Sequence, residues 1–157
     1  MLTEQQFALF GRFAFAFNEL EFLLPEYLEL MLGTPELAVA TELVKEQLFW
    51  KKVDRFKKVV QAIGTDRPVL RSKTDEATVI ANRATTLAKE RNKYIHAVLL
   101  SADSRTGQAR LLLKGNETPF NEAEVKSLIA KTESLVEALS EVCLDLIHLL
   151  EEQRKLS

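Results

Sequence analysis

The amino-acid sequence predicts an all-α protein, an up-and-down bundle of four to five helices with a short β-hairpin before the last helix. Apolar residues recur at spacings of three and four along most of the chain, which is the period of a buried helix face. Residues that start and stop helices separate these periodic stretches. A chain of 157 residues can bury a sizeable core, so we take 1–157 as a single domain.

The first helix is predicted to begin after Thr3, which can cap it, and to run to about Leu32, where Gly33 ends it. It is apolar on more than one face, and such a helix must be covered on more than one side. This favours a central position in the bundle, a dimer interface, or both. Glu21 interrupts an apolar stripe, either as a carboxylate at the rim of the bundle or as the counter-charge of an arginine.

A second helical stretch is predicted to start at Thr34-Pro35-Glu36 and to end at Gly64, with a drift in register between Leu48 and Phe49. Its second half carries a cationic outer face and an apolar inner face. The cations are Lys51, Lys52, Arg55, Lys57 and Lys58, and the inner side chains are Trp50, Val53, Phe56 and Val60.

The next helix is predicted to begin near Thr74 and to close with the segment KERNKYIHA, residues 89–97. Its apolar stripe continues directly into Arg91, so this guanidinium is expected to face the core or a partner. A buried guanidinium needs acceptors for its donors. Asn92 and His96 are four residues apart and share the adjoining face. An arginine, an amide and an imidazole this close together suit a phosphate-handling site.

Two short apolar runs, at 98–100 and 111–113, flank a glycine-containing turn at 103–107 and predict the β-hairpin. Asn121 is expected to cap the last helix, which runs to about Glu152 on a continuous apolar seam. Cys143 lies on that seam and is expected in the core. His148 lies off it and is expected at the surface or in an interface.

The net charge of −2 is unevenly distributed. Residues 51–114 hold 15 basic and 6 acidic side chains, a net charge of +9, whereas both flanking parts of the chain are acidic. The segment at residues 89–97 lies in this basic part, where a local excess of cations attracts polyanions such as RNA. Lys89 and Lys93 are the cations that we assign to RNA binding. The alternative is that the basic residues pair with acidic helices across the bundle.

Several classes of function lack their sequence signals. The chain has no signal-peptide pattern and no apolar run long enough for a membrane span, so a cytoplasmic protein without a membrane partner is expected. It has no phosphate-binding loop, dinucleotide-binding glycine pattern or nucleophile elbow. With one cysteine and two histidines, a zinc site is not expected. Any chemistry is therefore predicted to need neither metal nor cofactor.

RNA offers such chemistry, because its own 2′-hydroxyl can attack the adjacent phosphate. His96 is suited to proton transfer near neutral pH, and Arg91 can bind two phosphate oxygens while remaining charged. Asn92 would orient the imidazole or the substrate. A single imidazole serves poorly as both acid and base, but a twofold dimer would bring two copies of the motif into one cleft.

The segment from Arg91 to His96, read as R-N-x-x-x-H, resembles the motif of the HEPN superfamily of small helical proteins. The resemblance implies a homodimer with paired motifs at its interface and endoribonuclease activity in a toxin or phage-defence setting. It also implies an antitoxin or nucleotidyltransferase partner. Some members carry a tyrosine two residues after the histidine, where this chain has Val98, so regulation through that tyrosine is not carried over.

Two other interpretations stay open. In the first, the same three residues bind RNA or a nucleotide without cleaving it. In the second, the protein is a structural helical dimer in which Arg91 pairs with an acid such as Glu21 and His96 caps a helix end. A phosphate bound at Arg91 would favour a binding role over a purely structural one. Turnover of RNA would distinguish an enzyme from a protein that only binds RNA.

Overall fold

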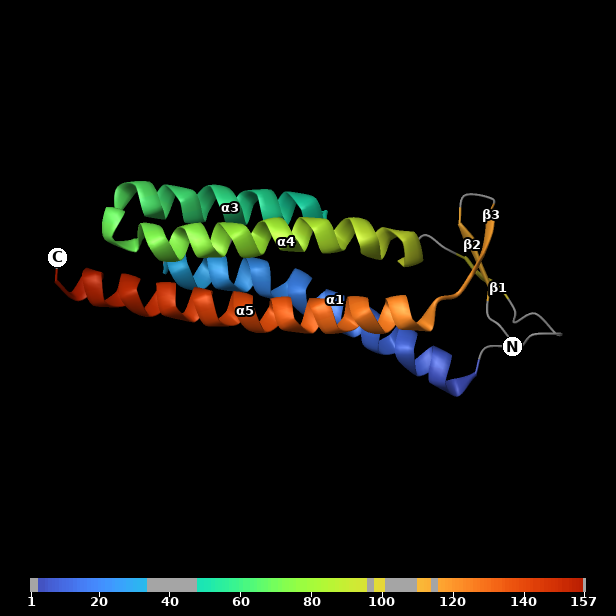
Figure 1. Cartoon of the computed structure of the whole chain (residues 1–157). Helices are drawn as coiled ribbons and strands as arrows, with labels where there is room; N and C mark the ends of the chain where they lie inside the picture. The colour runs from blue at the N-terminus through green and yellow to red at the C-terminus, as the bar shows by residue number, and fades with distance from the viewer. Residues whose placement is uncertain (1–2, 34–47, 96–97, 101–109, 114–115, 157) are drawn as a thin grey trace.

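The computed structural model describes residues 3–33, 48–95, 98–100, 110–113 and 116–156. Four long α-helices account for most of these residues: α1 (Glu4–Leu32), α3 (Phe49–Asp66), α4 (Arg71–Ile95) and α5 (Glu122–Lys155). Helices α3 and α4 lie side by side in one layer and α1 and α5 in the other (Figure 1). The predicted helical bundle is confirmed, and no described helix has the length and apolarity needed to cross a membrane.

Both ends of α1 form as the sequence predicts. The Thr3 hydroxyl accepts a hydrogen bond from the Gln6 backbone N–H at 3.2 Å, and the Gln6 side chain accepts one from the Thr3 N–H at 3.1 Å. This reciprocal capping box satisfies two donors that a helix start leaves unpaired. Gly33 takes a left-handed conformation with φ 61°, which glycine adopts without steric cost, and its N–H donates to the Glu29 carbonyl.

The predicted end of α3 at Gly64 is wrong, because α3 continues to Asp66. Gly64 is buried, and a Cβ added there would collide with the Thr74 hydroxyl of α4. The glycine therefore permits α3 and α4 to approach each other closely instead of ending a helix. The start predicted for this stretch, at Thr34, lies outside the described residues. A 3₁₀ turn, η1 (Pro68–Leu70), leads into α4, which begins one turn earlier than predicted.

Replacing Gly64 by alanine is expected to lower the free energy of unfolding by about 1–3 kcal/mol, because the new methyl group overpacks a filled interface. Gly11→Ala on α1 is the matched control at concentrations where the chain is monomeric, since nothing of the same chain lies within 4 Å of its added Cβ. In that exposed position alanine should stabilise the helix by up to about 1 kcal/mol. Urea unfolding of both variants measures the difference. A Gly64→Ala protein as stable as the parent would contradict the close packing.

The inner face of α3 differs from the prediction at two positions. Trp50, expected inside, is 59% exposed, whereas Lys52, expected on the cationic outer face, is only 6% exposed. The buried stripe begins at Phe49 and continues through Val53, so Lys52 lies one turn after Phe49 on the same face. The structure thus buries a lysine between helices.

The predicted two-stranded hairpin is replaced by a three-stranded antiparallel sheet, β1 (Val98–Leu100), β2 (Arg110–Leu113) and β3 (Asn116–Pro119), in the order β1-β2-β3. Strands β1 and β2 pair with each other at the positions of the predicted runs, and β3 adds to β2. The third strand was missed because its sequence, NETP, lacks the apolar alternation that signals a strand. The turn expected at 103–107 lies outside the described residues. The sheet lies where α4 ends and α5 begins (Figure 1).

Helix α5 starts as predicted, with the Asn121 side chain accepting a hydrogen bond from the Glu124 N–H at 3.1 Å. It ends at Lys155, about one turn later than predicted. Cys143 is fully buried, and burial raises the pKa of its thiol to about 12. His148 is exposed and lies 3.3 Å from the Glu152 carboxylate, so the prediction of a surface position is confirmed.

Candidate functional site

Arg91 reaches the interior from the end of α4, as its place on the apolar stripe predicts. Its guanidinium carbon lies 4.1 Å from the centroid of the Phe17 ring of α1, a cation–π contact. Phe17 is 1% exposed and packs on Phe49 of α3 with the ring centroids 4.8 Å apart. Arg91 therefore marks the point where α1, α3 and α4 meet.

A second cation lies in the same region. The Lys52 ammonium is 3.0 Å from a carboxylate oxygen of Glu21, and the side chains of Lys52 and Glu21 are 7% and 27% exposed. Glu21 is thus the direct counter-charge of Lys52, and its attraction for Arg91 acts over a longer distance. We call Glu21, Lys52, Arg91 and Phe17 the interhelical charge cluster. It holds two cations and one carboxylate.

The Arg91 guanidinium is incompletely satisfied. Its Nε is buried and has no hydrogen-bond partner, and no carboxylate of the described residues lies within 4 Å of it. Burial lowers the pKa of Arg91, and the Glu21 carboxylate opposes this shift. A buried donor without an acceptor costs about 1–3 kcal/mol, more when the group is charged. The side chain as a whole is only half-buried, so an oxyanion that reached the terminal amino groups of this guanidinium would bind a fixed positive charge without displacing a carboxylate of the described residues.

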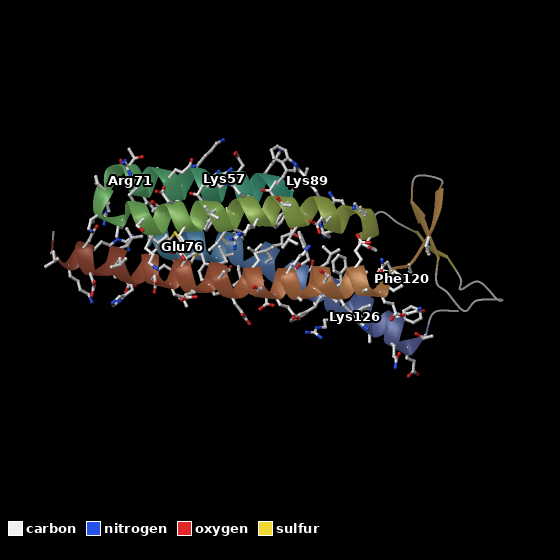
Figure 2. The ribbon with its side chains drawn as sticks, viewed as in Figure 1. Lys57, Arg71, Glu76, Lys89, Phe120 and Lys126 are labelled. Atoms are coloured by element: carbon white, nitrogen blue, oxygen red, sulfur yellow. The ribbon has the colours of Figure 1, made fainter. Side chains whose placement is uncertain are left out.

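The other predicted site residues lie elsewhere on α4. Lys89, Asn92 and Lys93 are exposed, and Lys89 projects from the α3–α4 layer near the end of the bundle (Figure 2). His96 lies outside the described residues. The structure therefore separates Arg91, which faces the other helices, from Lys89, Asn92 and Lys93, which face solvent on the same helix.

Tyr94, inside the motif, anchors the end of α4. It is 7% exposed, and its ring meets the Phe13 ring edge to face with the centroids 6.0 Å apart. Burial raises the pKa of Tyr94, and a hydrogen bond to the Glu124 carboxylate of α5 raises it further. Contacts to α1 and α5 thus hold the motif helix in one orientation. The sequence interpretation gave Tyr94 no role.

The basic part of the chain is only partly neutralised. Lys58 pairs with Asp54 at 2.7 Å, and Lys73 pairs with Asp145 at 2.8 Å, so some of the cations do bridge to acidic residues as the alternative predicts. Other cations of α3 and α4 make no ion pair with a described carboxylate. Figure 2 labels three of them, Lys57, Arg71 and Lys89. The cations without such a pair are Lys51, Arg55, Lys57, Arg71, Arg83, Lys89 and Lys93.

A groove of about 580 Å³ lies between α4 and α5, on a different side of α4 from the interhelical charge cluster. Its lining includes the buried Leu87 and Leu135, with Arg83 and Lys131 as cations. The sequence interpretation missed this groove. The signal was a row of small side chains four residues apart on α5, namely Ala130, Ser134 and Ala138.

No three His, Cys, Asp or Glu side chains among the described residues are placed to hold a metal ion. Comparisons of the chain with protein-family models, with curated proteins and with solved structures give no match.

Proposed function

We propose that this protein is a metal-independent endoribonuclease of the HEPN type, in which Arg91, Asn92 and His96 act on an RNA phosphodiester. The observation that carries the proposal is the state of Arg91, a planar cation held against Phe17 with a buried donor unsatisfied, five residues before His96 in the sequence. Structural arginines in a bundle ordinarily have their donors paired. Here the buried Nε has no partner, and a phosphate would bind the terminal amino groups of the same guanidinium.

In the proposed reaction the 2′-oxygen of the substrate forms a bond to phosphorus while the bond from phosphorus to the 5′-oxygen breaks. One imidazole accepts the 2′-hydroxyl proton, and the leaving oxygen receives a proton. Arg91 stabilises the charge on the phosphate oxygens, and Asn92 orients the imidazole or the substrate. Lys89 and Lys93 bind neighbouring phosphates. A twofold pairing of motif helices supplies a second His96, so that one imidazole acts as base and the other as acid.

The test is to incubate the purified protein with single-stranded RNA and analyse the ends of the products. Cleavage should leave a 2′,3′-cyclic phosphate or its opened form, since the nucleophile belongs to the substrate. EDTA should not change the rate, and DNA of the same sequence should survive. Cleavage of DNA, or loss of activity in EDTA, would refute this mechanism.

Replacing Arg91 by lysine is expected to lower RNA cleavage by ~10-fold or more while the protein stays folded, because lysine keeps the charge but loses the planar fork that binds two oxygens. Arg83→Lys is the matched control, since Arg83 is an exposed arginine two turns earlier on α4. Initial rates on one RNA substrate compare the two variants. Equal rates for both would remove Arg91 from the mechanism.

A second candidate function is RNA or nucleotide binding without cleavage. It is supported by the same orphaned Arg91 donor and by the cations of α3 and α4 that make no ion pair with a described carboxylate. RNA that binds but stays intact under every condition would establish this function in place of the first. A toxin or phage-defence role with an antitoxin or nucleotidyltransferase partner belongs to the proposal and rests on the motif alone.

A further inference from the structure

The face of α1 that points away from the bundle carries three exposed phenylalanines. Phe7, Phe15 and Phe22 are 59%, 71% and 58% exposed. Their spacings of eight and seven residues place them in one row along the helix. The core-facing side of α1 is already filled by other residues, including Phe13 and Phe17. A row of aromatic rings in water is unfavourable, and such patches mark interaction sites.

We propose that a second copy of this chain covers the row, with its α1 antiparallel to the first and a twofold axis beside Phe15. A twofold contact pairs each residue with its counterpart at the same distance beyond the axis. Phe15 then meets the partner's Phe15, and Phe7 meets the partner's Phe22, because these residues lie eight before and seven after the axis residue. The row of phenylalanines on α1 therefore matches the row of a second copy that runs in the opposite direction.

The charges beside the row obey the same symmetry. Arg12 lies three residues before Phe15 and Glu19 four after it, on the same flank of the row. In the antiparallel arrangement Arg12 of each chain lies opposite the partner's Glu19, whereas a parallel twofold arrangement would place the two copies of this flank on opposite sides of the contact, so that Arg12 and Glu19 would not meet. The Arg12 side chain remains 64% exposed although it binds Glu133 of its own chain. Charge complementarity therefore favours a second copy in this orientation.

The expected area is that of a modest but specific interface. Phenylalanines bury about 150–250 Å² each, so six rings that are now about 60% exposed supply roughly 600 Å² or more. Small exposed residues between the rings, among them Ala8, Gly11 and Ala14, let the two backbones approach and add further area. Together these contributions approach the lower end of stable interfaces, at about 1,200 Å².

This contact is distinct from the pairing of motif helices proposed above. It uses the outward face of α1, whereas Arg91 contacts Phe17 on the inward side of the same helix. A chain that used both contacts would form an assembly larger than a dimer, and it would close as a tetramer if the two twofold axes cross at right angles. The proposal for α1 does not depend on RNA cleavage.

Disulfide cross-linking tests the position of the axis. Phe15→Cys should form a covalent dimer under mild oxidation, because the two thiols meet at the axis. Phe22→Cys alone should not, because its thiols would be roughly 20 Å apart. A mixture of Phe7→Cys and Phe22→Cys proteins should form a mixed dimer. The native Cys143 does not compete, since it is fully buried. Cross-linking of Phe22→Cys to itself, or none of Phe15→Cys, would overturn the arrangement.

Light scattering at micromolar concentration tests the contact without new thiols. Phe15→Ser should halve the mass of the parent, and Leu144→Ser, at another exposed apolar residue, on α5, should leave it unchanged. Both residues are at the surface, so neither variant removes core packing. A monomeric parent would overturn the proposal, whether the row is left bare or binds a different protein. A Phe15→Ser protein with the parent's mass would also overturn it.

Discussion

Replacing His96 by alanine is expected to lower the rate of RNA cleavage by ~10²-fold or more, the usual contribution of a group that transfers a proton in the rate-limiting step. Binding of RNA should persist, because Arg91 and the cations of α3 and α4 that pair with no described carboxylate remain. Single-turnover rates measure the first effect and filter binding the second. Loss of chemistry with retained binding is the result that separates a catalytic imidazole from a phosphate-binding one.

His148→Ala provides the matched control for this experiment, because His148 is the other histidine of the chain. It is exposed on α5, and its ion-pair partner among the described residues is Glu152. Its replacement should leave the cleavage rate unchanged. Equal loss of activity in both variants would point to a general effect on the fold, and unchanged activity in His96→Ala would exclude His96 from the reaction.

The largest expected effect on stability is at Glu21. Replacing it by leucine removes the carboxylate that neutralises Lys52, whose side chain is only 7% exposed. Removing one partner of a buried pair costs about 3–5 kcal/mol, because the other charge stays buried without compensation. Arg91 would lose the same attraction, which adds to the effect.

The double variant Glu21→Leu with Lys52→Met should recover most of this loss. Both charges are then absent, and apolar side chains of similar size fill the space between α1 and α3. Urea unfolding of the parent, the two single variants and the double variant yields the coupling energy directly. A coupling energy near zero would mean that water, and not Glu21, compensates Lys52.

Much of the fold could be predicted because its signals are local. Thr3, Gly33 and Asn121 mark helix ends through hydrogen bonds or a backbone angle that involve only a few neighbouring residues. For the same reason the apolar spacing along α4 correctly predicts that Arg91 faces the other helices. A periodic pattern indicates which side of a helix is inside, whatever that side later touches.

The predictions from sequence were wrong at residues whose structural role depends on a residue far away along the chain. Gly64 reads as a helix end in the sequence, but its role is to make room for Thr74 on the next helix. Lys52 reads as a surface cation, yet it is buried because Glu21, 31 residues earlier, supplies a carboxylate at 3.0 Å. Likewise, β3 has no pattern of its own and forms a strand because β2 offers it an edge.

The sequence by itself determined the helical class, the positions of the caps, the inward direction of Arg91 and the motif on which the proposed chemistry rests. Tertiary structure alone decided which charges meet: Glu21 bonds Lys52, and Arg91 is left against Phe17 with a donor unsatisfied. It also decided that three phenylalanines of α1 stay exposed, since the sequence shows only that the helix is apolar on several faces. The physical reason is the distance along the chain between the residues that interact. Helix formation depends on neighbours within one or two turns, whereas ion pairing and burial depend on which helices the whole chain packs together.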